Sequence, residues 1–111
     1  MANKFKSYMT ALTTTNETTL ITASGTSVFI IGSIVIANTH ASTTSTISLV
    51  VTDTSAAADF NILTLKSFSA GISEEILSRP IIVENLDVLK AQATNANIFD
   101  IIISYIDRDR N

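Results

Sequence analysis

The chain has 111 residues, of which 46% are hydrophobic and only 15% are charged, and its net charge is −3. The acidic balance argues against a nucleic-acid-binding protein, because such proteins concentrate Lys and Arg on one surface, whereas the seven basic residues here are scattered. The lack of cysteine excludes disulfides and thiolate metal sites, and no apolar run approaches the roughly 20 residues of a membrane-spanning helix.

The N-terminal residues Met1 to Lys6 include two lysines but no apolar stretch follows them, so they do not resemble a secretory signal. We therefore expect the protein to be made in a cytoplasm and to leave it only by lysis. A soluble domain usually has about 25% charged residues. The low charge of this chain predicts a surface of Thr, Ser, Asn and Ala, or a surface partly buried against partners.

The first segment, from Lys4 to Thr15, is open to two interpretations. Four of its apolar residues have the spacing of one helical face: Phe5, Tyr8, Met9 and Leu12. However, no capping pattern closes such a helix, and the run from Thr13 to Thr15 favours β structure. We expect residues 1–15 to form an N-terminal arm or a first strand, with a helix as the alternative, and residues 16–111 to form a single β-sandwich domain.

A long central strand is predicted from Ser27 to Asn38, with Gly32 marking a bulge or a close approach of another backbone. An alternation of two places Val28, Ile30, Ile34 and Ile36 on one face and Phe29, Ile31, Val35 and Ala37 on the other. A strand with two apolar faces has to be covered on both sides. In so short a chain, we expect the second layer of the fold to cover one face and a neighbouring subunit to cover the other.

Further strands are predicted over residues 18–23, 45–53, 60–68, 72–77, 81–83, 88–94 and 98–107. The last strand should direct Phe99, Ile101, Ile103 and Tyr105 inward, with Asp100 and Ser104 outward. About eight short strands, separated by turns at intervals of roughly 8–12 residues, predict an all-β fold. The expected architecture is an antiparallel β-sandwich of jelly-roll type.

Residues that could carry catalysis are few. His40 is the only histidine and lies in a polar loop, so we expect no general base there. Glu74 and Glu75 are adjacent on a strand and therefore point to opposite faces, which favours protection of a sheet edge over acid–base catalysis. Loop carboxylates leave calcium binding as a weak alternative, without any recognisable ligand spacing. We predict no enzyme and no cofactor.

Several stretches resemble small structural proteins of tailed bacteriophages, notably those of aquatic hosts. The similar segments are Met1 to Lys6, Ala11 to Leu20, Val35 to Thr39, Leu86 to Ala93 and Phe99 to Ile106. The similarity covers most of the chain as a β pattern. The usual Pro-Ala-Gly turn after the second strand is Ala23-Ser24-Gly25 here, and Gly25 preserves the turn.

The resemblance implies a β-sandwich on a virion, with a role in decorating or cementing the capsid. The implied partners are the major capsid protein or other virion proteins and further copies of the chain, a trimer being favoured, with no nucleic acid or membrane. A neck, tail or baseplate protein is the alternative. A glycan-binding attachment module is a third hypothesis, weakened by the scarcity of aromatic residues.

The residues predicted to make assembly contacts lie near the two ends of the chain: Phe5, Tyr8, Met9, Leu12, Arg108 and Arg110. The apolar members precede the core pattern and would anchor an arm on a neighbour. The two arginines belong to a tail of alternating charge, which would be either a solvated end or a source of ion pairs with a partner.

Overall fold

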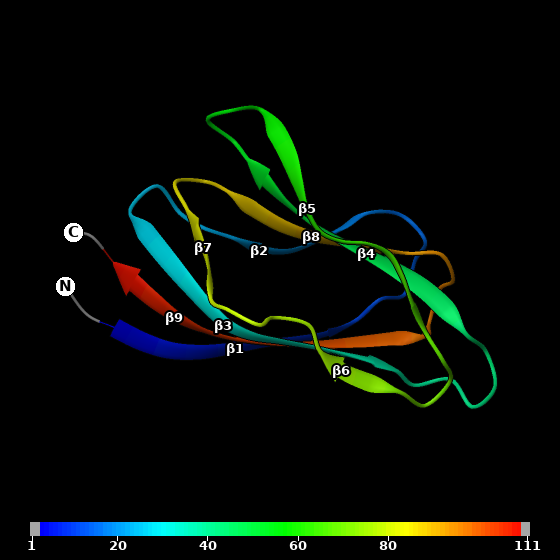
Figure 1. Cartoon of the computed structure of the whole chain (residues 1–111). Helices are drawn as coiled ribbons and strands as arrows, with labels where there is room; N and C mark the ends of the chain where they lie inside the picture. The colour runs from blue at the N-terminus through cyan, green and yellow to red at the C-terminus, as the bar shows by residue number, and fades with distance from the viewer. Residues whose placement is uncertain (1–2, 110–111) are drawn as a thin grey trace.

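Nine strands in two antiparallel sheets make up residues 3–109, the part of the chain that the computed structural model describes (Figure 1). The strands are β1 (Asn3–Ala11), β2 (Thr18–Thr22), β3 (Ser27–Asn38), β4 (Ser45–Asp53), β5 (Ala58–Phe68), β6 (Ser73–Glu75), β7 (Ile81–Glu84), β8 (Val88–Ala93) and β9 (Phe99–Asp109). In residues 3–109 we find no helix able to span a membrane.

The larger sheet has the order β1-β9-β3, and β6 and β7 both pair with the far side of β3; the smaller sheet has the order β2-β8-β4-β5. Consecutive strands cross from one sheet to the other, except at the β4–β5 and β6–β7 connections. This alternation between two sheets is the arrangement of a jelly roll, so the predicted fold class is confirmed. There are nine strands because two short ones, β6 and β7, share one edge position.

The N-terminal segment forms the first strand of the sandwich. β1 pairs with β9 without interruption, from Asn3 opposite Arg108 to Ala11 opposite Asp100. The helical alternative is therefore wrong. Phe5 and Met9 would share a helical face with Tyr8, but on a strand they do not. Odd-numbered residues of β1 face outward, while even-numbered ones face the smaller sheet.

The predicted bulge at Gly32 is confirmed, because the register between β3 and β9 shifts between Ile31 and Ser33. A Cβ atom built on Gly32 would meet no neighbour within 4 Å, so the glycine marks the bulge and not a close backbone approach. The bulge reverses the alternation. Ile31 faces the core before it and Ile34 after it, so the predicted division of this strand into two faces is wrong.

The core lies between the two sheets. Its fully buried side chains include Ile31, Ile34, Ile36, Ile47, Leu49, Val83, Leu89, Ile101 and Ile103. Phe68 and Phe99 meet edge to face, with 5.6 Å between ring centroids. The inward pattern predicted for the last strand is confirmed by β9, where Phe99, Ile101 and Ile103 are buried and Tyr105 packs against the core.

Candidate interaction surface on the larger sheet

The outer face of the larger sheet, which points away from the smaller sheet, carries two rows of apolar side chains. The first row has one residue each from β1, β9, β3 and β7: Phe5, Ile106, Ile30 and Ile82. The second row has one residue each from β1, β9 and β3: Met9, Ile102 and Val35. Register alone creates both rows, since each member lies opposite the next on the neighbouring strand.

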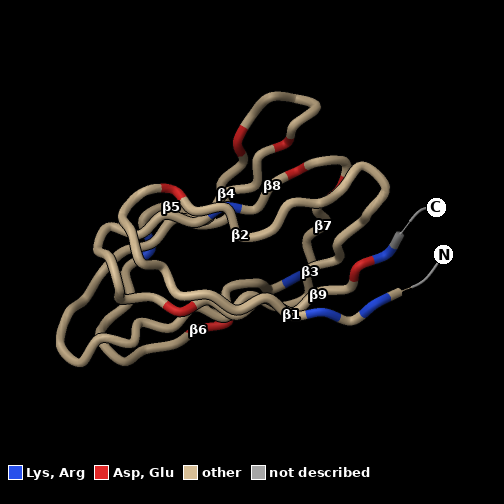
Figure 2. The backbone as a smooth tube through the Cα atoms, turned by 180° about the vertical axis from the view of Figure 1, so that it is seen from behind, with Lys and Arg blue, Asp and Glu red and all other residues tan. Residues whose placement is uncertain are grey.

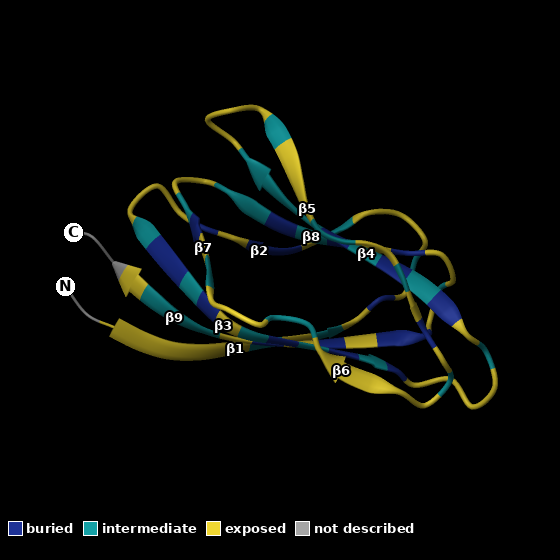
Figure 3. Ribbon diagram, viewed as in Figure 1, coloured by how far each residue is buried: buried dark blue, intermediate teal, exposed yellow. Residues whose placement is uncertain are grey.

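Much of this outer face is accessible to solvent. Its most accessible residues are Phe5, Met9, Ile82 and Ile102, with exposed fractions of 85%, 66%, 58% and 40%. They make up four of the eight large hydrophobic residues that are exposed among the described residues. Figure 3 shows that β1 is exposed along nearly its whole length. Contiguous apolar surface of this kind is typical of an interaction site.

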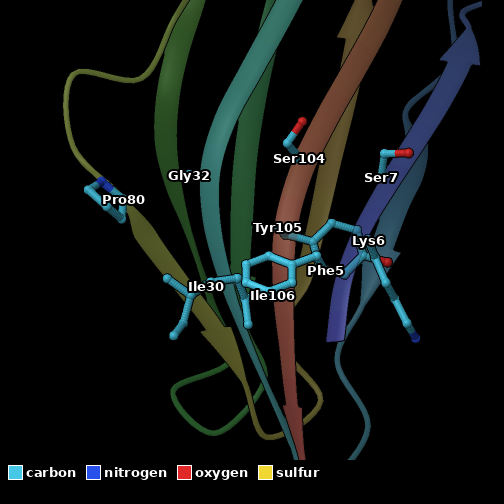
Figure 4. Close-up of a pocket in the computed structure, with 9 residues that line it drawn as sticks. All are labelled: Phe5, Lys6, Ser7, Ile30, Gly32, Pro80, Ser104, Tyr105 and Ile106. Carbon is cyan, nitrogen blue, oxygen red and sulfur yellow. The ribbon is translucent and has the colours of Figure 1, made fainter. Parts of the chain in front are cut away.

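A shallow depression of about 610 Å³ lies beside the first row. Its floor is made of small residues, Ser7, Gly32 and Ser104, which lie on three adjacent strands. Figure 4 shows Ile30, Ile106 and Phe5 along one side of this depression. The face is therefore a ridged surface with a hollow at its centre, a shape that fits a protruding side chain or strand of a partner.

Charged residues lie at the ends of this face and not within the two rows. Along β9, the outward residues run from Arg108 through Ile106, Ser104 and Ile102 to Asp100. Figure 2 shows the basic residues of β1 and β9 close to the chain termini. Lys6 points to the opposite side of β1 and binds Asp107 at 2.9 Å. The hydrogen bond to Asp107 raises the pKa of the Lys6 ammonium.

The structure separates the predicted contact residues into two groups. Phe5 and Met9 lie on the outer face, as an interface requires, and Arg108 is exposed at its end. Leu12 has an exposed fraction of 1% and offers no surface to a partner, so this part of the prediction is wrong. Tyr8 is half-buried against the core and lies on the side of β1 away from Phe5 and Met9, so its contact with a partner stays a prediction. Arg110 lies outside the described residues.

Four further residues of this surface were not among the predicted contact residues: Ile30, Ile82, Ile102 and Ile106. The signal was present in the last strand, where Asp100 and Ser104 were correctly assigned to the outward face. The same alternation places Ile102 and Ile106 on that face. Ile82 could not be assigned in this way, because its position follows from the pairing of β7 with β3.

At the opposite edge of the larger sheet, the carboxylate of Glu75 binds residues of β3. At the β3 bulge, Glu75 accepts hydrogen bonds from the amide of Ile34 at 2.8 Å, from the hydroxyl of Ser33 and from the amide of Leu77 at 3.2 Å. Desolvation acts to raise the pKa of the Glu75 carboxyl, but these hydrogen bonds outweigh it and hold the pKa below its ordinary value. The predicted edge position of this glutamate is confirmed, and its role in discouraging strand pairing stays a prediction.

His40 has a local structural role. Its Nδ1 accepts hydrogen bonds from the amides of Ser42 and Thr43, at 3.1 and 3.0 Å. The buried Asn38 supports the same loop by donating to the carbonyls of Thr43 and Phe68. The imidazole nitrogen that could act as a base is thus engaged in shaping the loop after β3.

The carboxylates in the loops accept hydrogen bonds from main-chain amides of the turns. Asp53 accepts hydrogen bonds from the amide and hydroxyl of Ser55 and from the amide of Ala56, and these bonds lower the pKa of its carboxyl. Asp87 accepts from the amides of Thr54 and Glu84. Within residues 3–109, no three His, Cys, Asp or Glu side chains gather as a metal site would require.

No known protein-family model and no curated protein matches this sequence. The functional interpretation therefore depends on the fold and on the surface described above.

Proposed function

We propose that this protein is a non-enzymatic structural component of a bacteriophage virion that decorates or cements the capsid. In this proposal, the outer face of the larger sheet packs against the major capsid protein or another virion protein. The protein functions on the particle as a homo-oligomer, and no bound cofactor is needed.

The observation that carries the proposal is the exposed apolar surface formed by Phe5, Met9, Ile82 and Ile102. Burial of apolar surface contributes roughly 25 cal/mol per Å². Symmetric repetition over a shell multiplies a modest contact many times. A protein that acts through packing alone needs such a face and needs no convergent catalytic side chains.

Two further arguments support a virion role. Jelly rolls are common in viral capsid proteins, although the same architecture occurs in lectins and cupins, so the fold supports the proposal only by analogy. The resemblance to small structural proteins of tailed phages, an expectation from the sequence, implies the same role. Both arguments agree with a surface built for packing.

The direct test is quantitative mass spectrometry of purified virions from the phage that encodes this chain. A decoration protein should be present at a copy number similar to that of the major capsid protein. A few copies per particle would instead favour the neck, tail or baseplate alternative. Absence of the chain from intact particles would contradict the proposal.

A binding experiment connects this test to the surface. We expect Ile102→Ser to weaken rebinding of the purified protein to particles from a phage that lacks it. Phe60→Ser is the matched control, because Phe60 is also exposed but lies on β5 of the smaller sheet. Equal binding by the two variants would show that the outer face is not the contact.

A further inference from the structure

The free edge of β1 presents main-chain hydrogen-bonding groups that no described residue pairs along most of its length. Leu12 donates its amide to Phe99 and accepts from Asn97, both at 2.9 Å, so its main chain faces the β9 side. In an antiparallel ladder, main-chain groups alternate between the two sides of a strand. The amides and carbonyls of Phe5, Ser7 and Met9 therefore point away from β9, toward the free edge.

Apart from its two lysines, Lys4 and Lys6, this edge lacks the usual protections against strand pairing. β1 runs for nine residues, Asn3–Ala11, in unbroken register with β9, and it contains no proline, bulge or acidic residue. Long, regular, partly apolar edges of this kind act as templates for another strand.

We infer that a second copy of this chain adds to the edge, with the two β1 strands antiparallel and Ser7 at the two-fold axis. In this register, Phe5 lies opposite Met9 of the second copy, and the same contact recurs across the axis. A thioether beside an aromatic ring is a favourable pair. All nine residues of β1 find a partner, and the outward residues exchange both main-chain hydrogen bonds.

Charge and length select this register over its neighbours. Sliding the strands toward the N-terminus places Lys6 opposite Lys6 of the second copy, or Lys4 opposite Lys6. Like charges directly opposite each other are destabilising. Sliding toward the C-terminus leaves the first residues of β1 unpaired and removes the contact between Phe5 and Met9. With Ser7 on the axis, Lys6 instead lies opposite Tyr8.

The pairing would join the two larger sheets into one continuous sheet. The first apolar row of one copy would then run into the second row of the other, so that the outer face doubles in width. This inference needs only the free edge of β1 and does not depend on the proposed virion function. The two-fold pair also differs from the trimer expected from the sequence, and the same measurement decides between them.

The first experiment measures the mass of the purified chain by light scattering at increasing concentration, together with Ser7→Pro and Ser7→Thr. We expect the mass of a dimer, made of two chains of 11.9 kDa each. Ser7→Pro removes the amide at the axis, and proline is tolerated on edge strands, so its dissociation constant should rise at least about tenfold. Ser7→Thr retains the amide and should remain dimeric. A monomer or a trimer of the unmodified chain would overturn the inference.

A second measurement does not depend on whether Ser7→Pro folds. The chain has no cysteine, so Ser7→Cys introduces a single thiol, which should lie close to its counterpart across the axis. Mild oxidation should give a disulfide-linked dimer. Ser104→Cys is the control, because Ser104 lies on β9 and on the same face. It should form far less of the disulfide-linked dimer. Equal cross-linking of both variants, or of neither, would overturn the inference.

A charge pair tests the register. Phe5→Lys and Met9→Glu should each raise the dissociation constant, and the double variant should recover most of the loss because opposite charges then face each other between copies. Within one chain the two positions are four residues apart on an extended strand, too far to pair with each other. Absence of recovery in the double variant would overturn the Ser7-centred register.

Discussion

The two edges of the larger sheet differ in almost every feature that controls strand pairing. At one edge, β1 is long, regular and free of acidic residues. At the other, β6 and β7 are short, Pro80 lies between them, and Glu74 and Glu75 add negative charge. Natural sheets protect edges with short strands, charges, prolines and bulges. One edge therefore combines several of these protections, whereas β1 has only its two lysines, Lys4 and Lys6.

The smaller sheet supports the same comparison. Its β5 edge is broken by two register shifts against β4, and Leu65 adopts a positive φ of 47°. At this irregularity the amide of Leu65 donates to the hydroxyl of Ser48 on β4, in place of a main-chain partner. At its other edge, β2 has only five residues. Among the described edge strands, only β1 is both long and regular, with two lysines as its only protection.

The largest expected effect separates a buried from an exposed residue of the N-terminal segment. Leu12→Ala should lower the free energy of unfolding by about 2–5 kcal/mol, because it leaves a cavity in the core. Phe5→Ala should change it by less than about 0.5 kcal/mol in dilute monomer, because Phe5 is exposed. Urea unfolding at low protein concentration measures both values. A loss at Phe5 as large as that at Leu12 would mean that the outer face is part of the core.

The next largest effect is expected when an acidic residue is placed on the free edge of β1. Ser7→Glu should weaken self-association more than about tenfold, because like charges then face each other across the interface. Ser104→Glu places the same charge on the same face but on β9, and should have a much smaller effect. Sedimentation velocity provides the comparison. If both variants lose association equally, contacts through the face, and not pairing at the edge, hold the copies together.

A smaller effect is expected at the protected edge. Glu75→Gln should lower the free energy of unfolding by about 1 kcal/mol at pH 7, since the carboxylate binds the amides and the hydroxyl at the bulge. The folded-state pKa of Glu75 lies below its value in the unfolded chain. Its contribution to stability is therefore present above the unfolded pKa and is lost as the pH falls through the folded one.

Urea titrations at a series of pH values below neutrality measure this linkage. The unmodified protein should lose stability on acidification, and the difference between it and Glu75→Gln should shrink. A difference that stays constant across the acidic range would show that the charge of Glu75 does not stabilise the bulge.

The smallest effect is expected for Glu74→Gln. The Nζ of Lys66 lies 3.4 Å from a carboxylate oxygen of Glu74, and both side chains are well exposed to solvent. Such surface pairs contribute roughly 0–1 kcal/mol, so the change in unfolding free energy should be about 0.5 kcal/mol or less. The mass in solution should stay the same, because the interruption between β6 and β7 still protects this edge. A higher oligomer would show that charge alone protects it.

The sequence was a good guide where one side of a strand is buried and the alternation is regular. The last strand is an example, because Phe99, Ile101 and Ile103 share one parity and all reach the core. The sequence was a poor guide at β3, where the bulge at Gly32 adds one residue. After the bulge, even-numbered residues face the core in place of odd-numbered ones, so simple alternation does not give the faces of Val28 to Ala37.

The candidate site was only half predictable, for a related reason. Phe5, Tyr8, Met9 and Leu12 look alike in a helical projection, but on a strand the first and third share one face while the other two share the opposite face. Which strand lies at an edge is a property of the topology, set by the pairing of β1 with β9. No local pattern in residues 1–15 encodes that position.

Amide hydrogen exchange of β1, followed by NMR at increasing protein concentration, tests the central claim most directly. The account predicts that the amides of Phe5, Ser7 and Met9 become protected as concentration rises, while those bonded to β9 are protected throughout. Rapid exchange of these three amides at every concentration would contradict it, because the edge would then remain open to water.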